Sequence, residues 1–221
     1  MAFGSKLASA DIPAEKPLDS PDVQFLPGHF GVEADALLAA LLSELELRPD
    51  ELVIGGQAIS TRRLHDFRAD PGKSYHYSGG LHAERPWTPA LLGVKERVEA
   101  ATGARFNACL CNYYQDGKVG MGWHADKEME LGERPVIASV SFGAERLFRF
   151  RRRLPWREPK AYEKWNFPLR HGDLLTMRGA TQRYFEHELA PQAKVAEPRL
   201  NLTFRLVLGQ RSLGSGSVHD I

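Results

Sequence analysis

The spacing of hydrophobic residues predicts two helices in the first half of the chain. Leucines recur at helical spacing through residues 33–47, and Pro49 follows as a helix stop. A second helix is predicted over residues 89–101, because Thr88 is a favourable N-cap residue and Gly103 stands just beyond the end. We expect both helices to pack on one outer face of the structure that the rest of the chain forms.

From residue 104 onward the hydrophobic period changes to two, which is typical of strands. Short runs bounded by Gly, Pro or Asp are predicted as strands, namely residues 105–114, 135–142, 146–152, 173–177, 183–189 and 199–208. Strands at this spacing favour an antiparallel sandwich or a jelly roll. We therefore predict a mainly β fold of the α+β class, with the helices on one face.

The two ends of the chain differ from its middle. Residues 1–22 contain no continuous apolar segment of the length that a signal peptide or a membrane span requires, and we expect a disordered leader there. Residues 209–221 are rich in Gly and Ser, which is typical of a flexible tail. With 221 residues, 43% of them hydrophobic, the chain can form one compact core, so we predict a single domain over residues 23–208.

Charge and cysteine content narrow the function classes. The formal net charge of +1 excludes a chain that is basic throughout, so nucleic-acid binding requires a local basic patch. Cys109 and Cys111 are the two cysteines, and they cannot build a disulfide framework or complete a zinc site. We expect a cytoplasmic protein without a membrane partner, associated with the nucleoid if its source is bacterial.

The sequence contains two His-x-Asp motifs, so the motif alone does not identify a metal site. A site of two histidines and one carboxylate on a β scaffold takes two ligands from one strand and the third from a strand several crossings later. His187 follows His124 and Asp126 after three or four strand-like runs. The second motif, residues 171–173, has no histidine at such a distance and fits a tight turn that opens the next strand. The spacing therefore favours His124 and Asp126.

Alternation along residues 183–189 points Phe185, His187 and Leu189 to one face of the predicted strand. An inward histidine is what a metal site inside a barrel requires. It is also what a buried core histidine looks like, and alternation leaves these two alternatives open.

The last predicted strand has an apolar face and a polar face. Its polar face carries Arg199, Asn201, Thr203 and Arg205. This face could lie in water, or it could line a cavity while the leucines pack under the helices. In a cavity, Arg199 and Arg205 would be about 20 Å apart at ~3.3 Å per residue. That span accommodates a short dicarboxylate with one guanidinium at each end.

An ordered series of motifs runs through the second half of the chain. It comprises His124-x-Asp126, His187, RLNLTFR at 199–205, CNYY at 111–114, PVIASVSFG at 135–143, HGDLL at 171–175 and RGATQRYFEH at 178–187. This series resembles the AlkB family of Fe(II)/2-oxoglutarate dioxygenases, which reverse alkylation damage on nucleobases. The resemblance covers about residues 52–208.

The resemblance implies a double-stranded β-helix, a jelly-roll variant, with Fe(II) held by His124, Asp126 and His187. Three protein ligands leave positions open for 2-oxoglutarate and O2. By analogy with the family, the residues that bind 2-oxoglutarate are Asn112, Tyr114, Arg199, Asn201 and Arg205. Of these, Arg199 would hold the far carboxylate and Arg205 would lie at the metal end. Ordinary cross-strand pairing is the alternative role of these side chains.

The implied reaction is oxidative demethylation of 1-methyladenine or 3-methylcytosine, in which 2-oxoglutarate becomes succinate and the methyl group leaves as formaldehyde. The implied partner is alkylated DNA, expected to be single-stranded, with RNA as a second substrate. A monomer is the expected assembly. The alternative is an Fe(II)/2-oxoglutarate hydroxylase acting on a protein or a small molecule, and a binding-only jelly roll is a third possibility.

Residues for substrate binding are also implied by the resemblance. Tyr75 and Tyr77 match the aromatic segment that closes over a flipped base, and Glu128 stands where relatives carry an acid that faces the base. Glu128 could equally be a solvated charge. Residues 65–70, HDFRAD, depart from the family pattern of an aromatic residue followed by Tyr-Gly-Asp, which leaves the lesion preference of the lid open.

Arginines interleaved with aromatic residues follow at 146–157. Arg149, Arg151 and Arg152 in this stretch suit a phosphate backbone and stacked bases. The alternative is a hairpin whose arginines pair with nearby acids, namely Glu145, Glu158 and Glu163.

Overall fold

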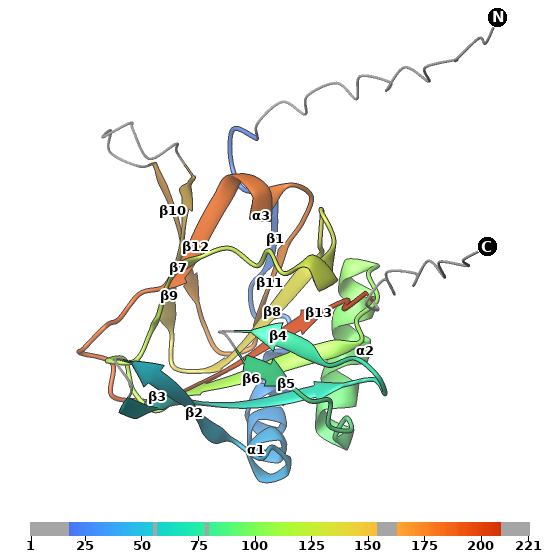
Figure 1. The fold of residues 1–221 in the computed structure, drawn as a ribbon, viewed down its shortest axis with the longest axis vertical. Helices are drawn as coiled ribbons and strands as arrows, with labels where there is room; N and C mark the ends of the chain where they lie inside the picture. The colour runs from blue at the N-terminus through green and yellow to red at the C-terminus, as the bar shows by residue number, and fades with distance from the viewer. Residues whose placement is uncertain (1–17, 55–56, 78–79, 154–162, 209–221) are drawn as a thin grey trace, which may run out of the picture.

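The computed structural model describes residues 18–54, 57–77, 80–153 and 163–208 (Figure 1). The expected leader up to residue 17 and the expected tail from residue 209 lie outside these ranges. The helices are η1 (Gly31–Glu33), α1 (Ala34–Glu44), α2 (Pro89–Thr102), η2 (Met129–Leu131) and α3 (Thr181–Tyr184). Among the helices that the structure describes, none combines the length and apolar composition that crossing a membrane requires.

The strands form two main sheets and a short hairpin, all with antiparallel pairing. The major sheet has seven strands in the order β1-β11-β8-β13-β6-β3-β2. They are β1 (Val23–Leu26), β2 (Arg48–Ile54), β3 (Gln57–Ala69), β6 (Ala108–Tyr114), β8 (Ile137–Gly143), β11 (Asp173–Met177) and β13 (Arg199–Arg205). The minor sheet has the order β10-β9-β12-β7, with β7 (Met121–His124), β9 (Arg146–Arg152), β10 (Lys164–Leu169) and β12 (Phe185–Leu189). The hairpin pairs β4 (Tyr75–Tyr77) with β5 (Gly80–His82).

Helices α1 and α2 cover the outer face of the major sheet (Figure 1). Leu41 from α1 and Val94 from α2 pack with Cys111 of β6 and Leu202 of β13 in one buried cluster. Thr88 caps α2 as predicted, because its side chain accepts a hydrogen bond from the backbone of Leu91. The prediction of helices packed on one face of a mainly β fold is confirmed.

A second core fills the space between the two sheets. Leu110 of β6 and Leu175 of β11 meet Phe150 of β9 and Phe185 of β12 there. The two sheets face each other as in a jelly roll, and this arrangement agrees with the double-stranded β-helix that the resemblance implied. Polar residues enter the space between the sheets at one end, and they form the site described below.

The sequence pattern did not predict β2 and β3, which lie between the two long helices. On β3 two runs of consecutive polar residues, 60–63 and 65–66, interrupt the alternation that identifies a strand, although residues 66–69 are all buried. Asp66 and Arg68 are buried because they pair with each other and with neighbouring residues. Ion pairing thus buries charged residues that the sequence pattern assigns to solvent.

Candidate metal centre

Two histidines and one aspartate meet at one end of the space between the sheets. The antiparallel register of β7 and β12 places His124 opposite His187, and their ring centroids lie 4.3 Å apart. Oδ1 of Asp126 lies 3.7 Å from Nε2 of His124. One ligand atom from each of the three residues lies within 4.8 Å of the other two.

The local structure explains how these side chains converge. On β12, Phe185, His187 and Leu189 are all buried, as alternation predicted. The prediction that His124 and Asp126 lie on one strand is wrong, because β7 ends at His124. Beyond the strand, the amide of Asp126 donates to Oε1 of Gln182 at 3.0 Å, which takes the place of sheet pairing.

The carboxylate of Asp126 is buried and ionised. Arg205 donates to its Oδ2 from Nε at 3.2 Å and from Nη2 at 2.8 Å. Burial alone would raise the pKa of Asp126, but the charge and the hydrogen bonds of Arg205 are the main opposing cause, and the pKa is lowered to about 2. Asp126 is therefore negative at neutral pH, as a metal ligand has to be.

His187 is held as a neutral imidazole. Its ring is 4% exposed and lies against Phe148 and Phe150, at centroid distances of 5.3 and 5.9 Å. Burial and the charge of His124 lower the pKa of His187 to about 3. A neutral imidazole keeps a lone pair for a metal ion. The ring of His124 is oriented by a 2.7 Å contact between its Nδ1 and the carbonyl oxygen of Gly122.

The donor set fits an Fe(II) ion. Oδ1 of Asp126 is buried and has no hydrogen-bond partner among the described residues. A buried carboxylate oxygen without a partner is costly, and a metal ion would satisfy it. Two histidines and one carboxylate on one side of an ion, with the other positions open, are typical of non-haem Fe(II) oxygenases.

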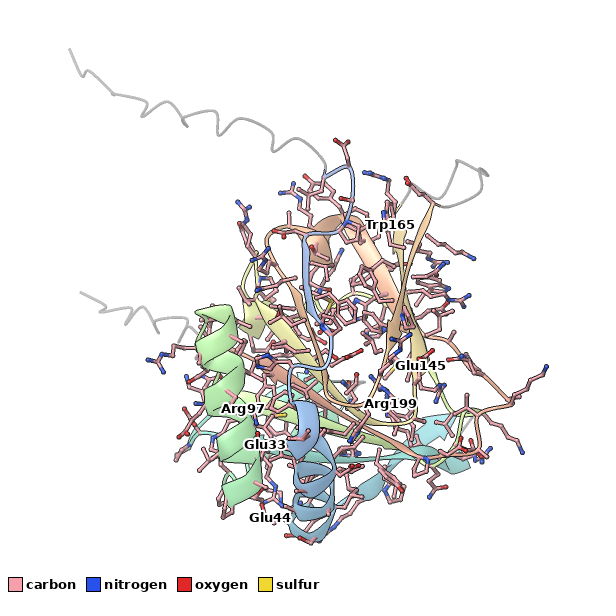
Figure 2. The ribbon with its side chains drawn as sticks, turned by 180° about the vertical axis from the view of Figure 1, so that it is seen from behind. Glu33, Glu44, Arg97, Glu145, Trp165 and Arg199 are labelled. Carbon is pink, nitrogen blue, oxygen red and sulfur yellow. The ribbon has the colours of Figure 1, made fainter. Side chains whose placement is uncertain are left out.

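A polar pocket continues from these residues along β6 and β13. The register pairs Tyr114 with Arg199 and Asn112 with Asn201, and all four residues line the pocket. They share the inward face because each strand alternates its side chains. Arg205 lines the same pocket beside Asp126. The structure thus brings together every residue that the resemblance implied for 2-oxoglutarate, and Figure 2 shows Arg199 between the two sheets.

Two buried polar groups of this pocket have unused capacity for hydrogen bonds. Oδ1 of Asn112 and Nε of Arg199 have no hydrogen-bond partner in the described part of the chain. Nη2 of Arg199 donates to Oγ of Ser141 at 2.9 Å, and the described residues offer this guanidinium no ion pair. Burial lowers the pKa of Arg199 to about 10, so the side chain is still cationic at neutral pH. A buried cation with an open donor fits the carboxylate of a ligand.

Sequence reasoning missed three polar residues of the site. Ser139 lines the pocket and accepts a hydrogen bond from Asn201, and Ser141 accepts from Arg199. Both serines alternate with apolar residues on β8, so the period-two pattern could have identified them. Gln182, which holds Asp126, lies in the short helix α3 and gives no periodic signal.

The second His-x-Asp motif forms the turn before β11, as predicted. Gly172 has a φ of +80°, a conformation that favours glycine. Nδ1 of His171 accepts from the amide of Gly143 at 2.8 Å. The carboxylate of Asp173 accepts from the amides of Gly28 and Arg170, each at 2.7 Å. These bonds give the motif a structural role.

The residues implied for the substrate lie on two segments, the strand β4 and the turn before η2. Tyr75 and Tyr77 are on β4, which pairs with β5, and the placement of their side chains lies outside the described part. Glu128 is half-buried, immediately before η2, and lines a second cavity together with Asp126 and Gln182. The second cavity therefore adjoins the metal centre through Asp126.

Two arginines of β9, Arg149 and Arg151, alternate with the buried Phe148 and Phe150 and pair with acids of β12. Arg149 forms an ion pair with Glu188, and Arg151 forms one with Glu186 at 2.6 Å. Sequence reasoning proposed other acids as partners. Of these, Glu145 pairs with Arg170, Glu158 lies outside the described residues, and no ion pair between Glu163 and these arginines is found in the described part.

Arg152 differs from its two neighbours. It donates to the backbone oxygen of Asp19 at 2.8 Å and lies over the ring of Phe185, with 5.4 Å between the guanidinium carbon and the ring centroid. A carbonyl oxygen satisfies a donor but does not neutralise the charge.

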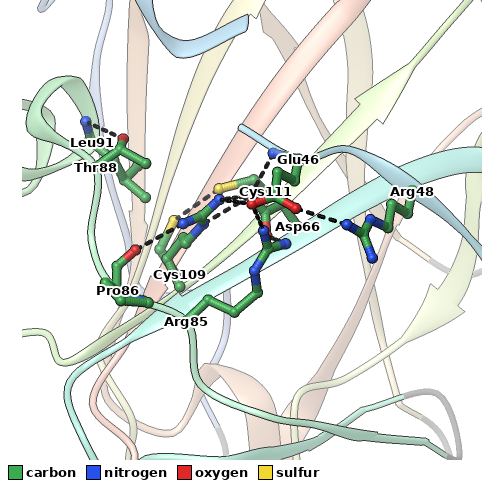
Figure 3. A network of polar contacts seen from close by, with 10 residues as sticks. Glu46, Arg48, Asp66, Arg85, Pro86, Thr88, Leu91, Cys109 and Cys111 are labelled. Carbon is green, nitrogen blue, oxygen red and sulfur yellow. Dashed lines mark hydrogen bonds and ion pairs between the residues drawn. The ribbon is translucent and has the colours of Figure 1, made fainter. Parts of the chain in front are cut away.

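The departure from the family pattern at residues 65–70 is part of a buried network at the base of the β4–β5 hairpin (Figure 3). The carboxylate of Asp66 accepts from Arg68 and Arg85, each at 2.8 Å, and from the amide of Glu46 at 2.9 Å. Nε1 of Trp87 donates to Asp70 at 2.7 Å. The network ties β3 to the segment before α2, so the chain that leads into the hairpin and the chain that leaves it are held together.

Comparison with known proteins agrees with this fold and this donor set. The model of the 2OG-Fe(II) oxygenase superfamily matches residues 23–205. The solved structure of OsALKBH1 has the same fold, with a TM-score of 0.54 at 18% identity over 85% of this chain and 97% of its own. The fold and the site together define a 2OG-Fe(II) oxygenase.

Sequence relatives narrow this class. The chain is 45% identical over 137 residues to alpha-ketoglutarate-dependent dioxygenase alkB homolog 3 of Rattus norvegicus, which covers 60% of this chain and 46% of the relative. It is 39% identical over 203 residues to DNA oxidative demethylase ALKBH2 of Bos taurus, over 85% and 73% of the two chains. The chain belongs to the AlkB family of 2OG-Fe(II) oxygenases. It spans just under half the length of the alkB homolog 3 relatives that it matches.

Proposed function

We propose that this protein removes methyl groups oxidatively from alkylated nucleobases, with 1-methyladenine and 3-methylcytosine in DNA as substrates and RNA as a second substrate. The observation that carries the proposal is the group of His124, Asp126 and His187, which opens into a pocket with Arg199 at its other end. Fe(II), 2-oxoglutarate and O2 would supply the oxidation, with succinate and formaldehyde as the other products.

The residues of the chain would bind and orient these groups. His124, Asp126 and His187 would hold the ion, while Arg205 fixes the free oxygen of Asp126 toward it. Arg199 would hold the far carboxylate of 2-oxoglutarate. Asn112 and Tyr114 line the pocket, and the amide nitrogen of Asn112 and the hydroxyl of Tyr114 can donate to the keto acid.

The substrate base would enter beside Asp126. We propose Glu128 as the acid that faces the base, because a methylated adenine or cytosine ring is cationic and a nearby carboxylate would favour it over the neutral base. Tyr75 and Tyr77 on the β4–β5 hairpin would close over the base. We propose single-stranded DNA as the preferred form, residues 23–208 as the catalytic unit, and a monomer as the active species.

A second candidate is an Fe(II)/2-oxoglutarate hydroxylase that acts on a protein or a small molecule. The observation in its favour is that Glu188 and Glu186 neutralise Arg149 and Arg151, which reduces the basic surface available to a phosphate backbone. This candidate keeps the metal centre and predicts that 2-oxoglutarate is consumed without demethylation of an oligonucleotide.

The test is anaerobic loading with Fe(II) and 2-oxoglutarate, followed by O2 and a short single-stranded oligonucleotide with one 1-methyladenine. We expect the mass of the oligonucleotide to fall by one CH2, because hydrogen replaces the methyl group, and succinate to form, and both changes to be absent in His124→Ala. His171→Asn is the matched control, because it removes the histidine of the other motif but keeps an acceptor for Gly143. Succinate without loss of the methyl group would favour the second candidate.

A further inference from the structure

Arg146, the first residue of β9, is a buried cation that the proposed function does not use. Its side chain is 1% exposed and ranks among the largest fully buried side chains of the described chain. Placing a guanidinium in a protein interior costs free energy unless its charge and its donors are both compensated.

The donors of Arg146 are compensated by backbone oxygens. Nη2 donates to the carbonyl oxygens of Val119 at 2.8 Å, Ala190 at 2.9 Å and Gly117 at 3.2 Å. Nη1 donates to the carbonyl oxygen of Asp116 at 3.3 Å. These oxygens belong to the loop between β6 and β7 and to the residue after β12. One side chain therefore connects the loop that follows Tyr114 with the end of the strand that carries His187.

The charge of Arg146 has no such compensation. No ion pair to Arg146 is found within the described residues, and its Nε has no hydrogen-bond partner there. The carboxylate of Asp116 attracts Arg146 from a longer distance, but it is itself paired with Arg62 at 3.0 Å. Carbonyl dipoles satisfy hydrogen bonds and leave the net charge in place. The interior here keeps a positive charge that an anion could balance.

Tyr114 connects this charge to the pocket. The guanidinium carbon of Arg146 lies 5.9 Å from the centroid of the Tyr114 ring, and that of Arg199 lies 5.6 Å from the same centroid. The charge of Arg146 also contributes to the lowered pKa of Arg199, after burial as the main cause. Two buried cations thus share one aromatic ring at the end of the pocket away from the metal centre, and neither has a carboxylate partner in the described chain.

We propose that Arg146 is a positioning residue of the 2-oxoglutarate pocket, whose uncompensated charge adds to that of Arg199 and makes the pocket select a dicarboxylate over a monocarboxylate. The inference rests on the proposed function, since it concerns the same pocket. Arg146 does not line the pocket and acts through Tyr114 and Arg199.

A purely structural role is the rival explanation. The loops that Arg146 connects are tightly packed, because a Cβ on Gly117 would meet the carbonyl oxygen of Gln192 at 2.0 Å and one on Gly120 would meet that of Leu189 at 2.5 Å. A clamp between such loops would influence every ligand of the pocket to the same degree. A charge would influence the far carboxylate selectively.

The test compares two ligands that differ by one carboxylate. Binding of 2-oxoglutarate and of 2-oxopentanoate to the Mn(II)-loaded full chain would be measured by isothermal titration calorimetry, which requires no turnover. The variants are Arg146→Gln, which keeps donors for the carbonyl oxygens without the charge, and Arg146→Lys, which keeps the charge. Arg170→Gln is the matched control, because it removes an arginine whose side chain is 69% exposed.

The measured quantity is the ratio of the two affinities. In Arg146→Gln a charge about 10 Å from the far carboxylate is removed in a partly shielded interior. The ratio of the affinity for 2-oxoglutarate to that for 2-oxopentanoate should therefore fall about tenfold. Arg146→Lys should keep the ratio within about threefold of the unchanged protein, and Arg170→Gln should leave it unchanged. An equal loss for both ligands in Arg146→Gln, or no loss, overturns the inference.

Two further outcomes are distinguishable. If circular dichroism shows that Arg146→Gln does not fold, Arg146→Lys is the deciding variant. A retained affinity ratio in this variant supports the role of the charge of Arg146, and a lost ratio overturns the inference. If the unchanged protein does not bind 2-oxoglutarate, the proposed function itself fails, and the inference fails with it.

Discussion

Arg205 binds one carboxylate oxygen of Asp126 and leaves the other oxygen to the two histidines. Both of its bonds go to Oδ2, at 3.2 and 2.8 Å, whereas Oδ1 lies 3.7 Å from Nε2 of His124. The arginine thus fixes the orientation of the carboxylate and neutralises part of its charge. Partners of this kind orient metal ligands and tune their affinity.

We expect Arg205→Gln to weaken Mn(II) binding about 10- to 100-fold, because Asp126 loses its orientation. Calorimetry with Mn(II) alone measures this effect without any contribution from 2-oxoglutarate. Arg178→Gln, which removes a half-exposed arginine paired with Asp22, is the control and should not change Mn(II) affinity. Equal Mn(II) affinity in Arg205→Gln and the unchanged protein would contradict this role.

Binding of metal and 2-oxoglutarate should stabilise the fold. At a ligand concentration about 100 times its Kd, the free energy of unfolding rises by about 2.7 kcal/mol. The expected readout is a higher Tm with Mn(II) and a further rise on adding 2-oxoglutarate. Asp126→Asn should abolish the rise with Mn(II), because it removes the charge of a ligand with little change in shape. A Tm that responds equally in this variant would argue against the site.

Asp66 should matter for stability because its carboxylate is the centre of the buried network. Replacing it by Asn leaves the buried Arg68 with only the half-exposed Glu46 at 3.9 Å as a charged partner, and we expect a loss of about 3 kcal/mol in the free energy of unfolding. Urea denaturation measures this change. Glu46→Gln is the comparison, because the Glu46 side chain is 53% exposed, and this variant should lower the free energy of unfolding much less than Asp66→Asn. A similar loss in the free energy of unfolding for both variants would show that burial of the carboxylate does not determine its contribution to stability.

The arginines of β9 should differ in their contribution to nucleic-acid binding. Glu188 neutralises Arg149, whereas Arg152 bonds to a carbonyl oxygen and keeps its charge. We expect Arg152→Gln to reduce the slope of log affinity against log salt concentration by about 1, and Arg149→Gln to reduce it less. Fluorescence anisotropy with a labelled single-stranded oligonucleotide measures both slopes. A larger effect of Arg149→Gln would mean that its ion pair opens on binding.

Much of the fold could be predicted because polar and apolar residues alternate along many of its strands, whether the polar residues meet solvent or line the site. Alternation identified β8, β9, β11, β12 and β13, and the capping residue Thr88 marked the start of α2. On β3 consecutive polar residues interrupt the alternation, and one of them, Asp66, is kept buried by its ion pairs with Arg68 and Arg85. Periodicity does not register ion pairs between polar residues, so it cannot find such a strand.

The residues of the candidate site that face inward from regular strands could be predicted from the sequence. The residues outside such strands could be predicted less well. His187 and Arg199 lie on regular strands, so alternation and the order of the motifs could assign them to one cavity. Asp126 lies beyond the end of β7, and its position depends on Gln182 and Arg205, which come from distant parts of the chain. Arg146 resembles a surface arginine in the sequence and becomes a buried cation only through loops that tertiary packing brings around it.

The stoichiometry of the reaction tests the central claim most directly. The loaded protein would be given limiting 1-methyladenine in a single-stranded oligonucleotide, and repaired base, formaldehyde and succinate would be quantified in the same samples. We expect one formaldehyde and at least one succinate for each base repaired, with no repair when 2-oxoglutarate is omitted or when Asp126 is replaced by Asn. Repair that proceeds without 2-oxoglutarate, or that survives Asp126→Asn undiminished, would contradict the account.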